Sequence, residues 1–349
     1  MEIEHGEAVY GEIPGASWDG ADGRLSWIEL GSPAADFAAD VRAGLTAAPK
    51  RLSCRYLYDR EGSRLFDEIC RLEEYYPTRA EDEILAAHAA GLAAGLPPGV
   101  TVFELGSGSA GKTRRLLSAI LARQRRLLYV PLDISTEALR ACAADLLPAL
   151  PGLELRAVAG DYDRGIARVD ELAPGPRLLL WLGSSIGNLD RGEAAAFLAK
   201  VRAAMGRDDR LLLGVDLKKD RRVLERAYDD AAGITARFDL NLLDRIDREL
   251  GGHFHRASFR HRASWNESAG RIEMHLVSLR PQIVRIDALG LAIPFAEGET
   301  IHTESSHKYA PGELDELAGR AGLTTVRRFV DAGERFADLL LAVASPGAI

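Results

Sequence analysis

Short apolar runs separated by helix-like stretches dominate the middle of the chain, from Val100 to about residue 218. Apolar runs that alternate with helical segments are typical of βαβ units, which build a parallel sheet. The runs are nearly continuous in Leu and Val, which favours strands covered by helices on both faces. The predicted strands are TVFEL (101–105), LLYVPLD (127–133), LELRAVAGD (153–161), RLLLWLG (177–183) and RLLLGVDL (210–217).

The segments on either side of this region have different patterns. Residues 1–35 are rich in Gly, Pro, Ser and Asp without clear periodicity, so we expect an irregular N-terminal arm. Helical periodicity begins near Asp36, and after residue 218 a predicted helix pair is followed by alternating, strand-like stretches. We therefore predict a doubly wound α/β domain at 79–218 and a smaller α+β domain formed by 36–78 and 219–349.

Composition and charge narrow the classes of partner. The 349 residues are 47% hydrophobic and 28% charged, which suits a folded protein with a large core. Acidic residues outnumber basic ones by 52 to 44, and the net charge of -8 disfavours nucleic acid as the main partner. No apolar run approaches the ~18 residues of a membrane span. We expect a small-molecule ligand, with no nucleic-acid or membrane partner.

Three cysteines, Cys54, Cys70 and Cys142, lie far apart and form no CxxC pair. This spacing suggests neither a disulfide framework nor a cysteine zinc site. The N-terminal residues MEIEHGEAVYGEIPG are acidic and lack the apolar core of a secretion signal. We expect a cytoplasmic protein.

The segment FELGSGSAGKT runs from a predicted strand through Gly106, Gly108 and Gly111 into a predicted helix. Glycines in such a loop permit positive φ and close approach of a ligand to the backbone, while the helix N-terminus supplies unpaired N–H groups. The motif indicates a nucleotide-type ligand. An ordinary glycine turn between strand and helix is the alternative.

The residues that close successive strands should converge at one edge of the sheet, where ligands of open α/β sheets bind. These are Glu104–Gly106, Asp133, Asp161 with Tyr162, and Gly183. An acid after the second strand can hold ribose hydroxyls, and an acid followed by an aromatic residue can hold adenine. The pattern favours adenosine, although Asp133 alone could be a turn or N-cap residue.

Dinucleotide oxidoreductases share the glycine loop and are the main competing class. The chain has no Tyr-x-x-x-Lys motif and no obvious histidine placed for hydride transfer. The sequence therefore fits this class less well.

Two further segments carry candidate ligand-binding groups. WLGSSIGNLD places Ser184, Ser185 and Asn188 at the end of the fourth strand, where Asn188 could alternatively cap the next helix. In IHTESSHKY, Glu304 and Ser306 alternate and would point the same way in an extended segment, which suits a substrate with two N–H donors. The alternative for Glu304 is an exposed acid in a loop.

His253, His255 and His261 have a spacing compatible with metal ligation, but no carboxylate or cysteine pattern accompanies them. We interpret them as surface-strand histidines and expect no metal.

Several blocks along the chain resemble the L-histidine Nα-methyltransferase family of ergothioneine biosynthesis. They are DVRAGLTAAPK, YDREGSRLFDEI, EYYPTRAEDEIL, ELGSGSAGKTRRLL, GSSIGNL, RAYDD, RIEMHL and TESSHKY, in the family's order from about Asp40 onward. The resemblance implies a Rossmann-like class I methyltransferase domain with S-adenosylmethionine (SAM) as co-substrate. It departs mildly at Ser185, where a threonine is common, and at Tyr162, where a phenylalanine is common.

The resemblance also implies a role for individual residues. For SAM it implies contacts in the glycine loop, at the ribose and at adenine. These contacts agree with the ligand site predicted above from the strand ends, which also includes Gly183. For histidine it implies three anchors of the carboxylate, two residues that recognise the imidazole, one that packs beside the ring, and a tyrosine near the α-amine with a catalytic role. The SAM residues are Gly106, Lys112, Asp133, Asp161 and Tyr162. The carboxylate anchors are Tyr75, Asn188 and Tyr228, and the imidazole is recognised by Glu304 and Ser306. Met274 packs beside the ring, and Tyr58 is the tyrosine near the α-amine.

The implied reaction is three successive methyl transfers to L-histidine, giving Nα,Nα,Nα-trimethylhistidine (hercynine) in the first step of ergothioneine biosynthesis. A related branch methylates a tryptophan-derived amine, but an indole has one N–H, so Glu304 favours imidazole. Two competing functions are Nα-methylation of another aromatic amino acid, such as a tryptophan derivative, and regulation by a non-catalytic SAM-binding protein. We expect a monomer.

Overall fold

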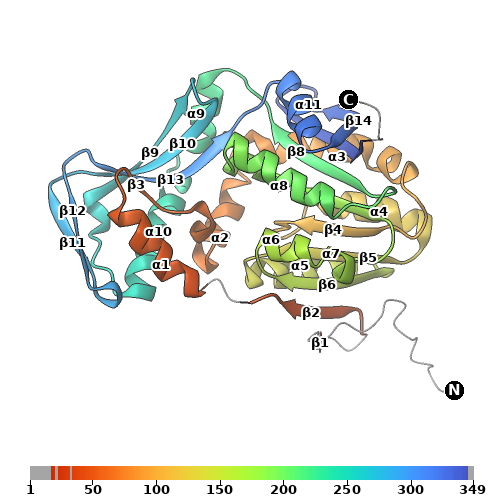
Figure 1. Cartoon of the computed structure of the whole chain (residues 1–349), viewed down its shortest axis with the longest axis horizontal. Coiled ribbons are helices and arrows are strands. Elements are labelled where there is room, and N and C mark those ends of the chain that lie inside the picture. Colours follow the sequence, from red (N-terminus) through yellow and green to blue (C-terminus); the bar gives the residue numbers. More distant parts are fainter. Residues whose placement is uncertain (1–16, 20–22, 32–33, 345–349) are drawn as a thin grey trace.

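The computed structural model describes residues 17–19, 23–31 and 34–344, and its largest element is a nine-stranded sheet (Figure 1). The strand order is β1-β2-β6-β5-β4-β7-β8-β15-β14. All neighbours from β2 to β8 pair in parallel. The mixed α/β prediction is confirmed. The strands are β1 (Ser17–Asp19), β2 (Leu25–Glu29), β4 (Thr101–Leu105), β5 (Leu127–Asp133), β6 (Leu153–Ala159), β7 (Arg177–Trp181), β8 (Arg210–Asp216), β14 (Leu323–Val330) and β15 (Phe336–Val343).

Helices cover both faces of this sheet, as the continuous apolar strands predict. Consecutive residues of a strand enter different cores: Val102 packs with one helix layer and Phe103 with the other. The first layer consists of α3 (Tyr76–Ala94), α4 (Thr113–Gln124) and α5 (Thr136–Ala149). The second consists of α6 (Tyr162–Ala167), α7 (Val169–Leu172), α8 (Arg191–Ala203) and α11 (Pro311–Arg320).

The strand order reverses direction between β4 and β7. From β4 the chain adds β5 and then β6 on one side, and afterwards β7 and β8 on the other. The loops after β4 and β7 therefore leave opposite sides of a shared crevice, which is where doubly wound sheets bind ligands.

A second group of elements has its own sheets and its own core. A four-stranded sheet with the order β3-β13-β10-β9 packs against α1, α2, α9 and α10, and β11 and β12 form a separate hairpin (Figure 1). The strands are β3 (Lys50–Arg51), β9 (Phe259–Asn266), β10 (Arg271–Ser278), β11 (Gln282–Ile286), β12 (Leu291–Phe295) and β13 (Thr300–His307). The helices are α1 (Ala34–Thr46), α2 (Arg60–Ile69), α9 (Arg221–Tyr228) and α10 (Ile234–Leu250).

Two predicted boundaries are wrong. Within the expected irregular arm 1–35, β2 joins the large sheet in parallel with β6, and Ser26 and Ile28 are buried; the rest of that arm lies mostly outside the described residues. Within 219–349, β14 and β15 extend the same sheet antiparallel to β8. FADLLLAV in β15 is apolar apart from Asp338, as expected of an inner strand, and it pairs with β8 rather than with the smaller sheet. No helix among the described residues is long and apolar enough to cross a membrane.

Candidate active site

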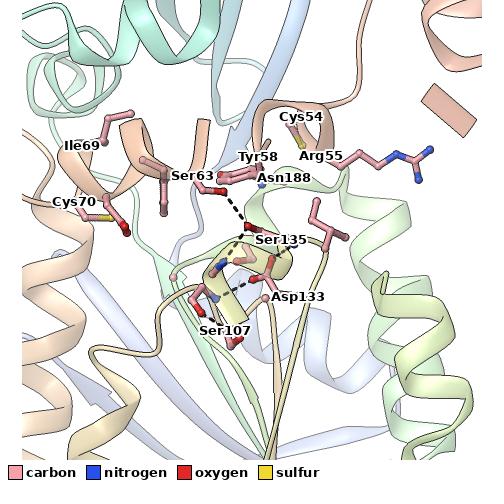
Figure 2. A pocket seen from close by; sticks show the side chains of 18 of the residues that line it. Cys54, Arg55, Tyr58, Ser63, Ile69, Cys70, Ser107, Asp133, Ser135 and Asn188 are labelled. Atoms are coloured by element: carbon pink, nitrogen blue, oxygen red, sulfur yellow. Dashed lines mark hydrogen bonds between the residues drawn. The ribbon is translucent and has the colours of Figure 1, made fainter. Parts of the chain in front are cut away.

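One large cavity lies between the carboxyl ends of the parallel strands and the elements of the second core. Its volume is about 1680 Å³, above the ~300–1,000 Å³ typical of a single small-molecule site, so it has room for two ligands side by side. In the view of Figure 2, Asp133 and Ser107 lie below Tyr58 and Asn188. All predicted site residues line this cavity: Tyr58, Tyr75, Gly106, Lys112, Asp133, Asp161, Tyr162, Gly183, Asn188, Tyr228, Met274, Glu304 and Ser306.

The glycine loop has the backbone conformation that its composition predicts. Gly106 and Gly108 have φ angles of 66° and 52°, in the left-handed region that favours glycine. A Cβ added at Gly108 or Gly111 would meet no atom within 4 Å, because both border the cavity. At Gly106 it would lie 2.3 Å from the hydroxyl of Tyr162. The loop therefore lets a ligand approach its backbone, as the bound nucleoside of a SAM site requires.

Asp133, at the end of β5, is held by backbone donors. The N–H of Gly108 donates to its Oδ2 (2.9 Å) and the N–H of Ser135 to its Oδ1 (2.8 Å), as Figure 2 shows. Ser135, not Asp133, caps α5 by accepting from the N–H of Ala138. The N-cap alternative for Asp133 is wrong, whereas the turn alternative is borne out in part, because Oδ1 accepts from the N–H two residues on. Each carboxylate oxygen retains a lone pair that can accept from a hydroxyl such as those of ribose.

Asp161 and Tyr162 begin α6. Asp161 caps this helix by accepting at Oδ1 from the N–H of Arg164 (2.9 Å), and its Oδ2 lies 3.5 Å from Nε of the same arginine. The ring of Tyr162 packs edge-on against Trp181, with 6.0 Å between ring centroids, and beside Phe197. The aromatic ring thus lies against the core between the large sheet and α8, with its hydroxyl at the glycine loop.

Lys112 is paired with a residue that the sequence reasoning did not identify. Its ammonium forms an ion pair with Glu81, a fully buried acid on α3. Glu81 also accepts from the N–H of Gly183 (2.8 Å), which follows β7. Glu81 therefore ties the glycine loop to the turn after β7 across the crevice. In the sequence Glu81 stands in the acidic run Glu81–Glu83, so nothing local distinguishes it from its solvent-facing neighbours.

Glu304 lies on β13 directly opposite Met274 on β10, and both side chains are buried at the cavity wall. The alternative of an exposed loop acid is wrong. Burial, and then the charge of nearby Asp239, raise the pKa of Glu304 to about 7. No hydrogen bond from another described residue reaches this carboxyl group, so its polar atoms remain for a ligand.

Ser306 follows on the same face of β13, as the alternation predicts. Its Oγ lies 2.8 Å from the hydroxyl of Tyr228, the last residue of α9. The ammonium of Lys308 contacts both hydroxyls. Sequence reasoning missed Lys308, although it stands in the TESSHKY block.

Tyr58 and Tyr75 belong to an aromatic wall that also contains Phe66 of α2 and Phe238 of α10. Ring centroids are 5.4 Å apart for Tyr58 and Phe66, and 5.5 Å for Tyr58 and Phe238. Neither tyrosine hydroxyl is hydrogen-bonded to another described residue. Burial, followed by the charge of Glu304, raises the pKa of Tyr58 well above its ordinary value of 10. Tyr58 is thus a neutral hydroxyl near pH 7, which can hydrogen-bond an amine but is a poor acceptor of its proton.

The polar groups predicted after β7 divide into two kinds. The hydroxyl of Ser184 accepts from the N–H of Asp216 (2.9 Å), and that of Ser185 donates to a backbone carbonyl, so both serve the turn. Asn188 closes the short 3-10 helix Ser185–Asn188, and Asp190, not Asn188, caps α8. The capping alternative for Asn188 is wrong, and its amide remains at the cavity.

The three histidines do not form a metal site: within 17–19, 23–31 and 34–344 no group of His, Cys, Asp and Glu could hold a metal ion. His253 and His255 are exposed. The prediction of a surface histidine is wrong for His261, which is buried, with Nδ1 2.7 Å from Asp239 and Nε2 2.9 Å from the carbonyl oxygen of Tyr228. The strand alternation turns His261 inward, behind Glu304.

Comparison with known proteins gives consistent matches. The family model for histidine-specific, SAM-dependent methyltransferases matches residues 37–343. A histidine N-alpha-methyltransferase of Mycolicibacterium smegmatis is 43% identical over 318 residues, covering 91% of this chain and 98% of that protein. Ergothioneine biosynthesis protein 1 of Neurospora crassa is 32% identical, covering 82% of this chain and 32% of that protein.

A more distant relative represents the alternative substrate class. The 4-dimethylallyltryptophan N-methyltransferase of Arthroderma benhamiae is 30% identical over 308 residues, covering 84% of this chain and 89% of that protein. The family model spans most of the chain and the M. smegmatis relative is matched along almost its whole length. The chain therefore belongs to the family of histidine-specific, SAM-dependent methyltransferases.

Proposed function

We propose that the protein transfers methyl groups from SAM to the α-amine of L-histidine three times, giving hercynine in the first step of ergothioneine biosynthesis. Membership of the histidine-specific family and the names of its relatives support this proposal. The structural observation that carries it is Glu304, a buried carboxyl group at the cavity wall without a hydrogen-bond partner among the described residues.

Glu304 and Ser306 suit an imidazole better than an indole. They lie two residues apart on one face of β13, and an imidazole has two ring nitrogens, each able to form one hydrogen bond. An indole has one N–H and no acceptor nitrogen, so it can hydrogen-bond only one of these two groups. Ser306 already has Tyr228 and Lys308 as partners, whereas Glu304 depends on the ligand for its partner. A ring that presents no donor to Glu304 leaves this buried carboxyl group unpaired, which costs about 1–3 kcal/mol or ~10- to 100-fold in selectivity. The tryptophan-type substrate is therefore not favoured.

In this proposal the other end of histidine meets neutral groups. Tyr75, Asn188 and Tyr228 would hold the carboxylate, and Tyr58 would lie near the amine. SAM supplies an activated methyl group, so the chain mainly has to hold the amine in line with the donor at near-attack distance.

The amine must be neutral when it is methylated, since an ammonium has no lone pair. A poorly solvated site disfavours the charged amine, and the aromatic wall of Tyr58, Phe66 and Phe238 provides such surroundings. Because the pKa of Tyr58 is raised, its hydroxyl would orient the amine while water accepts the proton.

For the remaining residues we propose contacts with SAM through Gly106, Lys112, Asp133, Asp161 and Tyr162, beside Gly183. The cavity fits this assignment because Gly108 and Gly111 expose their backbone there and Asp133 keeps free lone pairs. A monomer in the cytoplasm stays a prediction.

The test is mass spectrometry of the purified protein incubated with SAM and, separately, with L-histidine, L-tryptophan or histamine. The expected result is a gain of one, two and finally three methyl groups on histidine, with histamine inert because it lacks the carboxylate. Methylation of tryptophan or histamine in place of histidine would refute the proposed anchors. A protein that binds SAM but methylates none of the three would favour the regulator.

A further inference from the structure

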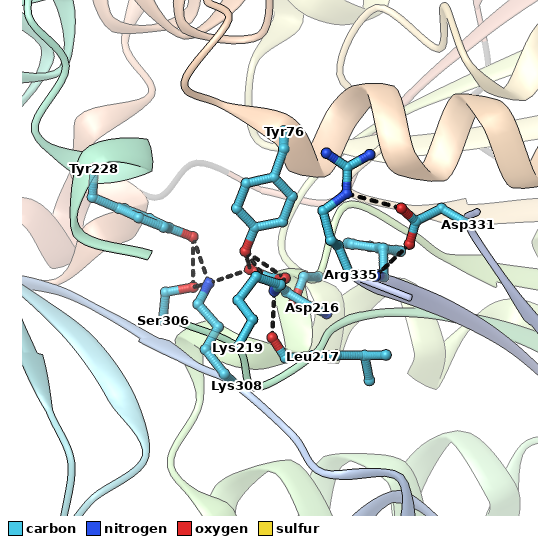
Figure 3. A network of polar contacts seen from close by, with 11 residues as sticks. Tyr76, Asp216, Leu217, Lys219, Tyr228, Ser306, Lys308, Asp331 and Arg335 are labelled. Carbon is cyan, nitrogen blue, oxygen red and sulfur yellow. Dashed lines mark hydrogen bonds and ion pairs between the residues drawn. The ribbon is translucent and has the colours of Figure 1, made fainter. Parts of the chain in front are cut away.

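Lys308 is a fully buried ammonium group immediately after β13 (Figure 3). It lies 2.9 Å from the hydroxyl of Tyr228, 2.8 Å from Oγ of Ser306 and 2.7 Å from Oδ2 of Asp216. Burial opposes its charge, but the neighbouring Asp216 raises the pKa of Lys308 above its ordinary value. Lys308 is thus a permanent cation one residue layer behind the cavity wall.

These contacts fix the direction of the neighbouring hydrogen bonds. An ammonium has three N–H donors and no acceptor, so Lys308 donates to both Tyr228 and Ser306. The two hydroxyls are also bonded to each other, over 2.8 Å, which uses one of their two protons. One hydroxyl proton is left to be donated elsewhere. When Ser306 donates to Tyr228, that remaining donor belongs to Tyr228 and is available to an anionic ligand.

The charges around Asp216 do not cancel. Its carboxylate contacts Lys308 and also Lys219, whose Nζ lies 2.5 Å from Oδ1 and 2.7 Å from the hydroxyl of Tyr76. Two ammonium groups share one carboxylate, which leaves a positive charge behind Tyr228. The proposed carboxylate anchors Tyr75, Asn188 and Tyr228 are themselves neutral. A buried carboxylate held only by neutral groups is costly unless a countercharge lies close.

We propose that Lys308 is a positioning residue for substrate recognition: it orients the hydroxyl of Tyr228 and supplies, through it, the positive charge that balances the α-carboxylate of the amino-acid substrate. This rests on the proposed function, which puts that carboxylate on Tyr228. Lys308 itself does not line the cavity and touches no reacting atom.

The experiment measures binding of L-histidine and of histamine, by calorimetry in the presence of S-adenosylhomocysteine, to the wild type and to Lys308→Met. The expected result is a histidine dissociation constant ~10- to 100-fold higher in the variant, with that of histamine changed less than ~3-fold. A merely structural role would weaken both ligands equally. Equal weakening, or an unchanged histidine affinity, would overturn the proposal.

Two further variants sharpen this test. Lys219→Met removes the other ammonium of the cluster, which touches Tyr76 rather than Tyr228. It cancels the excess positive charge but keeps the direct donor to Tyr228, so the histidine dissociation constant should rise less than in Lys308→Met. An equal or larger rise would contradict the role of Lys308 in orienting Tyr228. In a Tyr228→Phe background the hydroxyl that links Lys308 to the substrate carboxylate is absent, so Lys308→Met should change histidine affinity less than ~3-fold. A full additional loss there would contradict transmission through Tyr228.

Loss of folding and failure of the proposed function give different results. If Lys308→Met does not melt cooperatively, the double variant Lys308→Met with Asp216→Asn removes both charges of the buried pair and enters the same assays. A wild type that binds S-adenosylhomocysteine but not histidine would refute the proposed function. Histidine binding by the wild type, with variants that do not separate histidine from histamine, would refute the role of Lys308 alone.

Discussion

Replacing Glu304 with Gln should stabilise the ligand-free protein in a pH-dependent way. Glu304 is buried without a hydrogen-bond partner among the described residues, and burial raises its pKa from 4.5 to about 7. A carboxyl group whose pKa is raised by folding holds its proton more tightly in the folded than in the unfolded chain. Unfolding therefore releases a proton between these two pKa values, and stability falls as the pH rises through that window.

The magnitude follows from the same two values. At about 1.4 kcal/mol per pH unit, the interval from 4.5 to about 7 corresponds to ~3 kcal/mol of destabilisation above pH 7 and to none well below pH 4.5. At pH 5 roughly 1 kcal/mol of it is already present. The amide of Gln has no charge to titrate. The stability advantage of Glu304→Gln over the wild type should thus grow by ~2–3 kcal/mol between pH 5 and pH 8.

Thermal melting of both proteins at pH 5, 6, 7 and 8 measures how the difference in stability grows with pH. Comparing the difference across pH values removes any constant contribution from burying the amide of Gln. For a chain of this length we expect the difference in Tm to rise by roughly 3–6 °C, mostly below pH 7. Glu297→Gln, an exposed acid in the turn before β13, is the matched control and should show no such trend. A difference in Tm that stays constant with pH would refute the reasoning.

Three other experiments test separate parts of the cavity and the fold. Asp133→Ala should raise the apparent constant for SAM ~10-fold or more in steady-state kinetics and leave that for histidine unchanged; equal effects on both would contradict a ribose contact. Glu304→Ala should raise the KM for histidine ~10- to 100-fold and admit tryptophan, as competition assays would detect. Gly62→Ala would bring a Cβ to 1.7 Å from the carbonyl oxygen of Leu57 and should destabilise the protein by ~1–3 kcal/mol. Gly91→Ala, whose Cβ meets no atom within 4 Å, is the control and should be neutral or stabilising. Chemical denaturation measures both free energies of unfolding.

The central sheet was predictable because its strands are apolar on both faces. TVFEL and RLLLWLG leave no polar side for water, so helices must cover them, and the large sheet has such strands at its centre. The same property placed β15 in this sheet, although sequence order assigned it elsewhere. β2 is only five residues long, with Ser26 between the partly buried Leu25 and Trp27, so its pattern is too short to be distinguished from a loop.

Residues of the cavity wall were predictable where their residue type has one usual structural role at that kind of position. Glycines with positive φ, and a carboxylate at the end of a parallel strand, are of this kind. Glu81, Asp216 and Lys308 are not, because in a sequence a charged residue normally indicates the surface. Their burial follows from ion pairs between segments that lie far apart along the chain, as between Asp216 and Lys308. No local pattern contains that information.

The position of Lys308 behind Tyr228, rather than in the cavity, has a physical rationale if the proposed reaction is right. The reacting partners are a sulfonium and an amine that becomes a permanent cation, so an unpaired ammonium group facing them would repel both. Lys112, which does line the cavity, is paired with Glu81. At an effective dielectric constant of ~20, two unit charges 4 Å apart interact by about 4 kcal/mol, and this energy is inversely proportional to the distance. The ammonium of Lys308 lies 2.9 Å behind the hydroxyl of Tyr228. From there it still stabilises the proposed substrate carboxylate, which contacts that hydroxyl. The added distance weakens its repulsion of the methyl-transfer centre, where Tyr58 presents only a neutral hydroxyl.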